Sequence, residues 1–224
     1  PHRGIETITY IIRGKVSHGD SIGNSGTIGA GDVQWMTAGS GIIHQEMPEG
    51  DEQGVLRGLQ LWANLPASHK MMPPRYQELS SDMIPVTDYA AGVTVRVIAG
   101  ECRGVTGPVK DIITAPTLLD ITLEEGKGAM FQLQESDNAF LYVLDGVLGI
   151  GESEGTLPSG HCALLGSGEA LSLTGGQDVT RAVLVAGRPL NEPIAWRGPI
   201  VMNTREELDT AFSELRENRF IRPH

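Results

Sequence analysis

The chain has 224 residues, of which 28 are acidic and 17 basic, so its formal net charge is -11. The length suffices for one large or two small domains with hydrophobic cores. The acidic balance argues against direct nucleic-acid binding, and the apolar runs are far shorter than the ~20 residues that cross a bilayer. Two cysteines without a CxxC motif indicate a reducing compartment, so we expect a cytoplasmic protein.

Most of the chain shows the alternation of β-strands rather than the period of helices. Glycine accounts for 29 of the 224 residues and falls between these short segments. Many short strands with glycine-rich turns predict an all-β sandwich or barrel. The clearest same-face sets are Ile8, Tyr10 and Ile12; Leu59, Leu61, Ala63 and Leu65; Val93, Val95 and Val97; and Leu119, Ile121 and Leu123.

Two segments depart from the strand pattern. Residues 66–85 interrupt it with a Met-Met-Pro-Pro run, which indicates a crossing segment between two halves. Near the end, Thr204 and Glu207 have the spacing of a capping box. They precede a helical stripe of Leu208, Ala211, Phe212 and Leu215, which predicts a short C-terminal α-helix covering a barrel.

An internal repeat indicates two similar β-domains in tandem. The segment 10–14 (YIIRG) recurs as 142–146 (YVLDG), and 27–32 (TIGAGD) recurs as 156–161 (TLPSGH). We place the domains at residues 1–80 and 81–224, the second including the C-terminal helix. Before its copy of the repeat the second domain has several strands that the first lacks. We therefore expect the first barrel to have further strands upstream of Pro1.

His2, His44 and Glu46 form a candidate metal site in the first domain. His44 and Glu46 are two residues apart, so in an extended strand they point to the same face. The repeat places Gln134 opposite His2. It also places Leu173 opposite His44 and Gly175 opposite Glu46. Because amides and leucine do not replace imidazole and carboxylate as ligands, we expect the metal chemistry in the first domain only.

Longer motifs make the whole chain resemble the pirin family of bicupin proteins. The most distinctive motif runs from Gly31-Asp32 through His44-Gln45-Glu46 to Met47-Pro48. The others are Pro1-His2-Arg3-Gly4 with Glu6 and 7–10 (TITY), 58–65 (GLQLWANL), 76–79 (YQEL) and 198–204 (GPIVMNT). The resemblance implies two tandem cupin (jelly-roll) β-barrels, with one mononuclear metal in the N-terminal barrel.

The family pattern also implies the ligand set. The resemblance implies that the iron is bound by a His-x-His pair, by a later histidine and by a glutamate two residues beyond that histidine. Here these positions correspond to His2, His44 and Glu46, and the first member of the pair would lie before Pro1. The expected cofactor is Fe(II), although the same donors accept Mn, Ni, Cu or Zn.

Two functions follow from the resemblance. The first is a quercetin 2,3-dioxygenase, which opens a flavonol ring with O2 and uses Glu46 as ligand and proton acceptor. The alternative is a metal-dependent, redox-sensing regulator that binds a protein partner of transcription or metabolism. We favour the enzyme because a site with open coordination positions suits a substrate.

Other polar residues near the motifs have less specific interpretations. Glu6 lies four residues after His2, in apparent strand alternation with it. It could orient an imidazole from outside the ligand set, or lie on a solvated strand edge. The remaining histidines lack a partner at ligand spacing and are expected on the surface: His18, His69, His161 and His224.

Overall fold

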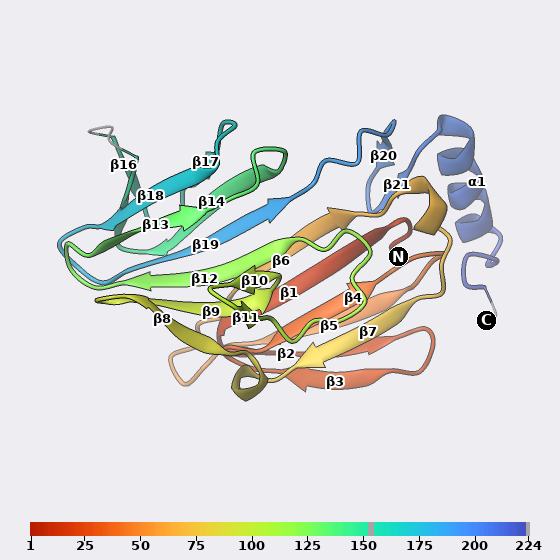
Figure 1. Cartoon of the computed structure of the whole chain (residues 1–224). Helices are drawn as coiled ribbons and strands as arrows, with labels where there is room; N and C mark the ends of the chain where they lie inside the picture. The colour runs from red at the N-terminus through yellow and green to blue at the C-terminus, as the bar shows by residue number, and fades with distance from the viewer. Residues whose placement is uncertain (152–154, 223–224) are drawn as a thin grey trace. The chain divides into compact units, whose positions relative to one another are not determined.

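The computed structural model describes residues 1–151 and 155–222 and divides the chain into two compact units. The first unit comprises residues 1–81 and 190–224, and the second comprises residues 82–189 (Figure 1). Segment 190–224, which the sequence-based boundaries group with the second domain, thus makes its contacts in the first unit. Strands dominate the described residues, as predicted, and no helix among them is long and apolar enough to span a membrane.

The first unit contains two sheets and a small hairpin. The four-stranded sheet has the order β6-β1-β4-β7, and the three-stranded sheet has the order β3-β2-β5. Its strands are β1 (Ile5–Arg13), β2 (Lys15–Asp20), β3 (Ser25–Ile28), β4 (Val33–Thr37), β5 (His44–Glu49), β6 (Arg57–Asn64) and β7 (Arg75–Leu79), with the hairpin β20 (Ala195–Arg197) and β21 (Ile200–Met202). The strand β7 lies inside the predicted crossing segment, which otherwise contains the short 3-10 turns Ala67–His69 and Ser81–Met83.

The second unit has a six-stranded sheet, β17-β14-β19-β12-β9-β8, and a four-stranded sheet, β13-β18-β15-β16. A two-stranded hairpin, β10-β11, completes it. Its strands are β8 (Val86–Ala90), β9 (Val93–Ala99), β10 (Glu101–Cys102), β11 (Val105–Thr106), β12 (Thr117–Leu123), β13 (Gly128–Gln132), β14 (Asn138–Asp145), β15 (Val147–Ile150), β16 (Thr156–Pro158), β17 (Cys162–Leu164), β18 (Ala170–Gly175) and β19 (Thr180–Gly187).

The strand order shows the internal repeat directly. The neighbours β6-β1-β4 match β19-β14-β17, and β3-β2-β5 match β16-β15-β18. The register agrees as well, because Tyr10 faces Val33 in one copy and Tyr142 faces Cys162 in the other. The two short sequence matches therefore lie on equivalent strands of two similar barrels.

One predicted correspondence shifts by two residues. In the first unit Val16 faces Pro48, whereas its counterpart Leu148 faces Gly175. By this register the counterparts of His44 and Glu46 are Leu171 and Leu173, instead of Leu173 and Gly175. Gly175 lies 13 residues after Cys162, whereas Pro48 lies 15 residues after the equivalent Val33. A difference of two residues leaves the strand alternation unchanged.

Buried charges join segment 190–224 to the first unit. Lys70 Nζ donates hydrogen bonds to the carbonyl oxygens of Gly4 and Val201, both at 2.9 Å, and to Asn64 Oδ1 at 2.7 Å. Gly4 has a φ of 78°, and a Cβ built there would lie 1.9 Å from the Val201 carbonyl oxygen. Only glycine therefore allows this approach of the two backbones.

The predicted helix, α1 (Arg205–Arg216), lies in the same segment and has the expected capping box. Its Leu208 and Ala211 are buried against Ile200 and Phe220. Arg3, 2% exposed, reaches this segment from the other end of the chain, and its Nη1 lies 2.6 Å from Glu214 Oε2. The helix therefore packs within the first unit.

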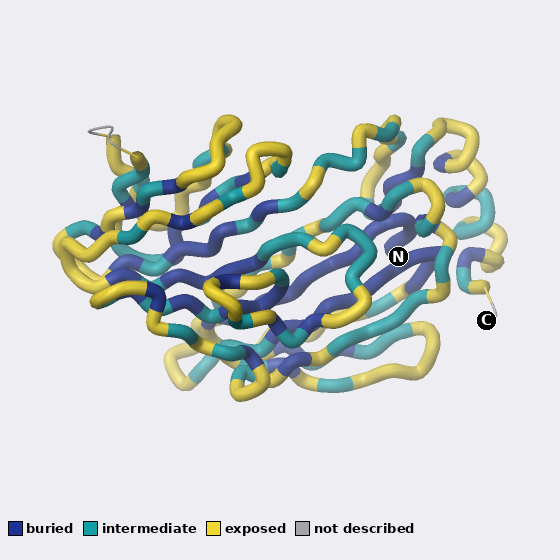
Figure 2. The backbone as a smooth tube through the Cα atoms, in the orientation of Figure 1, coloured by how far each residue is buried: buried dark blue, intermediate teal, exposed yellow. Residues whose placement is uncertain are grey.

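The cores of the two units differ in composition. In the second unit a continuous apolar cluster includes Phe131, Leu141, Leu173 and Leu184. In the first unit β1 is buried along nearly its whole length (Figure 2), on both faces of the strand. Its buried residues include polar ones, so one face of β1 provides a polar wall inside the barrel.

Candidate metal centre

His2 and His44 lie side by side at one end of the first unit. The backbone of His2 pairs with Ile42 through two hydrogen bonds, which brings His2 beside the start of β5. The two imidazole centroids are 5.0 Å apart. A contact between residues 42 positions apart in sequence thus comes from a short bridge outside the main strands.

Glu46 follows His44 on the same face of β5, as the two-residue spacing predicts. His44 Nδ1 lies 4.0 Å from Glu46 Oε1. Gln60 Nε2 donates to both carboxylate oxygens, at 3.1 and 3.3 Å, and Thr9 Oγ1 lies 3.5 Å from Oε1. Sequence reasoning missed Gln60 and Thr9, although both lie at alternate positions of strands that it did predict.

Burial keeps the two imidazoles neutral. His2 is 8% exposed, and burial, followed by the nearby His44, lowers its pKa to about 4. Burial also lowers the pKa of His44, and the opposing influence of Glu46 is smaller. Metal ligation requires neutral imidazole, so this environment has the ligands in the correct protonation state near neutral pH.

The hydrogen bonds of the histidines fit a metal ion. His2 Nδ1 donates to the Pro199 carbonyl at 3.3 Å, which leaves Nε2 as a donor atom. A hydrogen bond to a backbone carbonyl commonly orients metal-binding imidazoles in this way. His44 Nδ1 is buried and has no hydrogen-bond partner within residues 1–151 and 155–222. An unsatisfied buried nitrogen beside a carboxylate is a site that a cation can complete.

The described residues do not form a closed cluster of three or more His, Cys, Asp or Glu side chains around one point. The structure brings His2 to His44, and His44 to Glu46, without gathering all three at ligand distances. Trp62 forms a further wall of the site, edge-on to the His2 ring at 5.3 Å between centroids, and is 42% exposed. Its exposed indole gives the site an apolar side open to solvent.

Glu6 has neither of the roles considered for it. It is fully buried, not on a solvated edge, and it accepts a 2.7 Å hydrogen bond from Thr37 on β4 rather than from a histidine. The alternation with His2 fails because β1 begins only at Ile5 and Gly4 before it has a positive φ. The chain therefore turns between His2 and Glu6.

His18 was expected on the surface, and this expectation is wrong. Its side chain is 3% exposed, Nε2 lies 2.7 Å from Glu78 Oε1, and the ring stacks on Tyr76. His18 faces Glu46 across the β2–β5 pair. No local spacing signals this, since Glu78 comes from a strand that sequence analysis did not predict. His161 is exposed and His69 half-buried, while His224 lies outside the described residues.

Two similar β-barrels in one chain, with histidines and a carboxylate inside the first, define a bicupin. The family models agree: residues 1–63 match pirin, and residues 118–221 match the pirin C-terminal cupin domain. A pirin-like protein of Solanum lycopersicum is 45% identical over 99% of this chain and 76% of its own length. The chain therefore belongs to the pirin family, as its motifs indicated.

Two further similarities concern proteins named for flavonol oxidation. A Thermoplasma acidophilum protein named "Putative quercetin 2,3-dioxygenase Ta0133" is 40% identical over 99% of this chain and 91% of its own length. A crystal structure titled quercetin 2,3-dioxygenase from Acinetobacter baumannii is 35% identical, with a TM-score of 0.90 over 98% of this chain and 77% of that chain. The all-β fold of two tandem cupin barrels is thereby confirmed.

Proposed function

We propose that this protein is a metal-dependent dioxygenase that cleaves flavonols such as quercetin with O2. In this proposal His2, His44 and Glu46 hold one metal ion, Fe(II) being the expected one. The observation that carries it is the pair of buried neutral imidazoles, one with an unsatisfied nitrogen beside Glu46. The relatives named quercetin 2,3-dioxygenase support the choice of reaction.

The bound metal would supply Lewis acidity for the substrate's enolate oxygens and an open position for O2. The protein's own residues provide the rest. Glu46 is 29% exposed, so a substrate hydroxyl can reach its carboxylate. Gln60 donates to both carboxylate oxygens and so fixes their orientation.

Proton transfer is the step assigned to Glu46. A flavonol reacts with O2 as its enolate, so its 3-hydroxyl group must first lose its proton. Glu46 accepts that proton at Oε2, while Thr9 donates to Oε1 and Gln60 orients the carboxylate through both oxygens. The exposed face of Trp62 offers a flat apolar surface beside His2, which suits an aromatic substrate.

The test is metal analysis of the purified protein followed by quercetin turnover with Fe(II), comparing wild type with His44→Ala. We expect stoichiometric metal in the wild type. In His44→Ala we expect loss of metal and a large fall in turnover. The fall should exceed the roughly 10- to 100-fold caused by removing a residue that only hydrogen-bonds to a metal ligand. His161→Ala is the matched control, because this histidine is exposed and lies in the second unit.

Three outcomes would contradict the proposal. Wild-type protein without stoichiometric metal contradicts the metal site. Turnover retained in His44→Ala excludes His44 as a required ligand. Bound metal without quercetin turnover retains the site but rejects the flavonol reaction, and the regulatory alternative then becomes the better hypothesis. Anaerobic mixing separates these steps further, since a metal-dependent shift of the quercetin absorption band reports binding without oxygen chemistry.

A further inference from the structure

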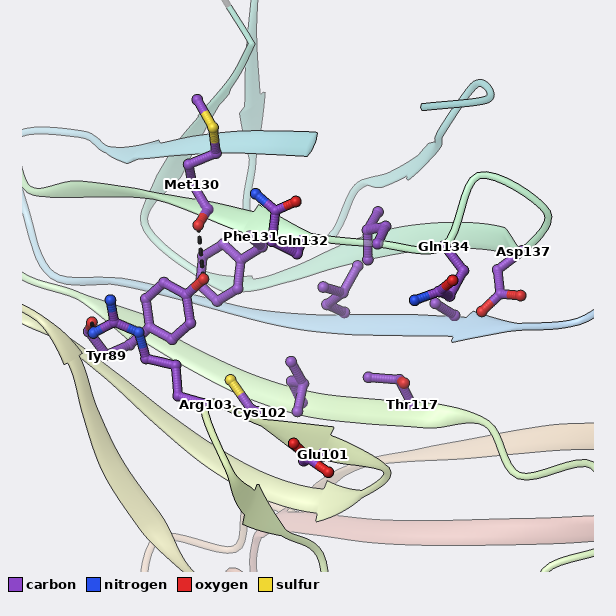
Figure 3. Close-up of a pocket in the computed structure, with 14 residues that line it drawn as sticks. Tyr89, Glu101, Cys102, Arg103, Thr117, Met130, Phe131, Gln132, Gln134 and Asp137 are labelled. Carbon is purple, nitrogen blue, oxygen red and sulfur yellow. Dashed lines mark hydrogen bonds between the residues drawn. The ribbon is translucent and has the colours of Figure 1, made fainter. Parts of the chain in front are cut away.

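The second unit contains a cavity of about 680 Å³ (Figure 3). Its apolar floor is formed by Leu119, Leu184 and Ala186 on the six-stranded sheet and by Phe131 on β13. This volume lies within the range of sites for small organic molecules, about 300–1,000 Å³. No histidine lines the cavity, so its chemistry is separate from the proposed metal centre.

The register shows where this cavity lies in the repeated fold. In the first unit Thr9 on β1 faces Gln60 on β6. In the second unit their counterparts, Leu141 on β14 and Leu184 on β19, face each other in the same way. Leu184 in the cavity floor therefore occupies the position at which Gln60 holds the Glu46 carboxylate.

Two more lining residues occupy positions of the candidate metal centre. Ala186 corresponds by the same register to Trp62, since Thr7 faces Trp62 and Ala139 faces Ala186. Leu133 corresponds to His2, because Leu133 N donates to the Glu169 carbonyl as His2 N donates to that of the equivalent residue, Ile42. The exchange of an indole for a methyl group removes bulk beside the cavity, and the exchange of imidazole for an isobutyl side chain removes a candidate metal ligand. The second unit thus has a cavity where the first has its candidate metal centre.

Charged and polar side chains surround the opening of this cavity. Glu101 and Arg103 come from the β10–β11 hairpin, and Gln134 and Asp137 come from the loop after β13 (Figure 3). The hairpin turn requires left-handed backbone at Arg103, with a φ of 51°. A left-handed conformation is unfavourable for a residue other than glycine, so it persists only where the surrounding structure holds it. The turn therefore fixes the positions of Glu101 and Arg103 at the opening.

The charge of Arg103 is directed to Tyr89 instead of into the cavity. The guanidinium lies 4.7 Å from the centroid of the Tyr89 ring and donates to the Tyr89 carbonyl oxygen. Tyr89 is in turn fixed by stacking on Phe131, at 4.3 Å between centroids, and by a 2.7 Å hydrogen bond to the Met130 carbonyl. Glu101 and Asp137 together still outnumber the single cation Arg103 among the lining residues, so the opening is negative, and the chain's net charge of -11 adds to this.

We propose that this cavity binds a small molecule without a metal, and that its ligand has an apolar ring and an amine. The apolar floor accepts the ring. The carboxylates of Glu101 and Asp137 and the amide of Gln134 receive the donor groups. A carboxylate on the ligand would face like charges, so acidic molecules bind more weakly. This inference stands independently of the proposed dioxygenase function.

Two probes of equal shape and opposite charge test the proposal: tyramine, and 3-(4-hydroxyphenyl)propionate. The full chain is titrated while the methyl signals of ¹³C-labelled alanines are followed by NMR. Ala186 lines the cavity and is 2% exposed, whereas Ala90, exposed in the same unit, does not line it. A ligand of this size binds in the millimolar range, approximately. We expect tyramine to shift the Ala186 methyl signal but not that of Ala90, and the acid to bind at least about tenfold more weakly.

A charge variant supplies the second half of the test. Glu101→Gln with Asp137→Asn keeps the shape of the opening and removes both carboxylates. We expect tyramine affinity to fall about tenfold in this double variant. Glu135→Gln is the matched control, because this carboxylate is exposed nearby without lining the cavity, and its affinity should stay at the wild-type value.

The proposal fails if the Ala186 signal does not shift at about 10 mM tyramine, or if the Ala90 signal shifts equally. It also fails if the acid binds as tightly as tyramine, or if the double variant keeps wild-type affinity. None of these measurements involves the metal or quercetin turnover. A failure here is therefore distinct from a failure of the dioxygenase proposal.

Discussion

Six strands of the first unit match six strands of the second in the same order, yet the side chains in the two interiors differ in polarity. In the first, the face between β1, β5 and β6 carries His2, His44, Glu46, Thr9 and Gln60. In the second, the equivalent face is largely leucine and alanine. A fixed backbone register therefore accommodates either a polar site or an apolar cavity, and the site must be argued from its side chains.

The largest effect is expected from giving the second unit the carboxylate of the first. Leu173, fully buried, is the counterpart of Glu46, so Leu173→Glu places an unpaired carboxylate in an apolar core. We expect a loss of at least about 4 kcal/mol in the free energy of unfolding, measured by denaturant titration. Leu164→Glu is the control, because Leu164 is 86% exposed. Equal effects of the two variants would contradict the assigned register.

The next effect tests how the first unit depends on segment 190–224, which has no equivalent in the second. Lys70→Met removes the donor of three hydrogen bonds, of which the two to the backbone at Gly4 and Val201 are buried. We expect a loss of about 3 kcal/mol, because the buried acceptors remain unsatisfied. Lys15→Met, at a half-exposed lysine, should change the free energy of unfolding little. If Lys70→Met left the free energy of unfolding unchanged, water would be shown to replace the ammonium group as the hydrogen-bond donor.

A smaller, pH-dependent effect is expected at the Arg3–Glu214 pair. Burial alone would raise the pKa of Glu214, but the hydrogen bonds and charges of Arg3 and Arg222 together outweigh it and lower the pKa below 4.5. The ionised carboxylate therefore stabilises the folded state above pH 4.5, and this contribution is lost as the pH falls through the folded-state pKa.

Glu214→Gln should thus cost about 2 kcal/mol at pH 7 and progressively less below pH 4.5. Thermal or denaturant unfolding across this pH range measures the difference from wild type. Glu52→Gln, at an exposed loop residue of the same unit, should show no such dependence. If the loss in free energy of unfolding did not change with pH, packing of the Glu214 side chain, and not its charge, would account for the stabilisation.

The smallest effect places a residue of the second unit in the first. Gln60→Leu introduces the side chain found at its counterpart, Leu184, and removes the donor that orients Glu46. If the proposed metal centre is correct, metal affinity should fall about tenfold with little change in stability. Gln45→Leu, between His44 and Glu46 but on the opposite face of β5, is the control. Equal metal affinities in both variants would argue against Glu46 as a ligand.

Much of this arrangement could be predicted from sequence because it depends on local pattern. Strand alternation gave the β-barrels, the capping box at Thr204 gave α1, and two short matches gave the repeat. The pairing of His44 with Glu46 follows from the period of a strand. These features need only residues that are close in sequence, or that recur at a constant interval.

What sequence analysis missed depends on contacts between distant segments. His18 is buried by Glu78, sixty residues later, and Glu46 is held by Gln60 from a different strand. The two-residue shift in the repeat comes from a shorter connection, which alternation cannot detect because its period is two. The expectation for Glu6 was wrong because the positive φ of Gly4 interrupts the strand alternation between His2 and Glu6. A glycine in a sequence does not reveal whether its φ is positive or negative.

The discontinuous make-up of the first unit has a consequence for synthesis on the ribosome. The second unit is one uninterrupted stretch, residues 82–189, and all its strands emerge together. Residues 1–81 of the first unit emerge earlier, but Arg3 and Lys70 meet their partners at Glu214 and Val201 only after the whole second unit has been synthesised. The part that leaves the exit tunnel first is therefore completed later than the unit that follows it, and until then its apolar surface and strand edges stay exposed.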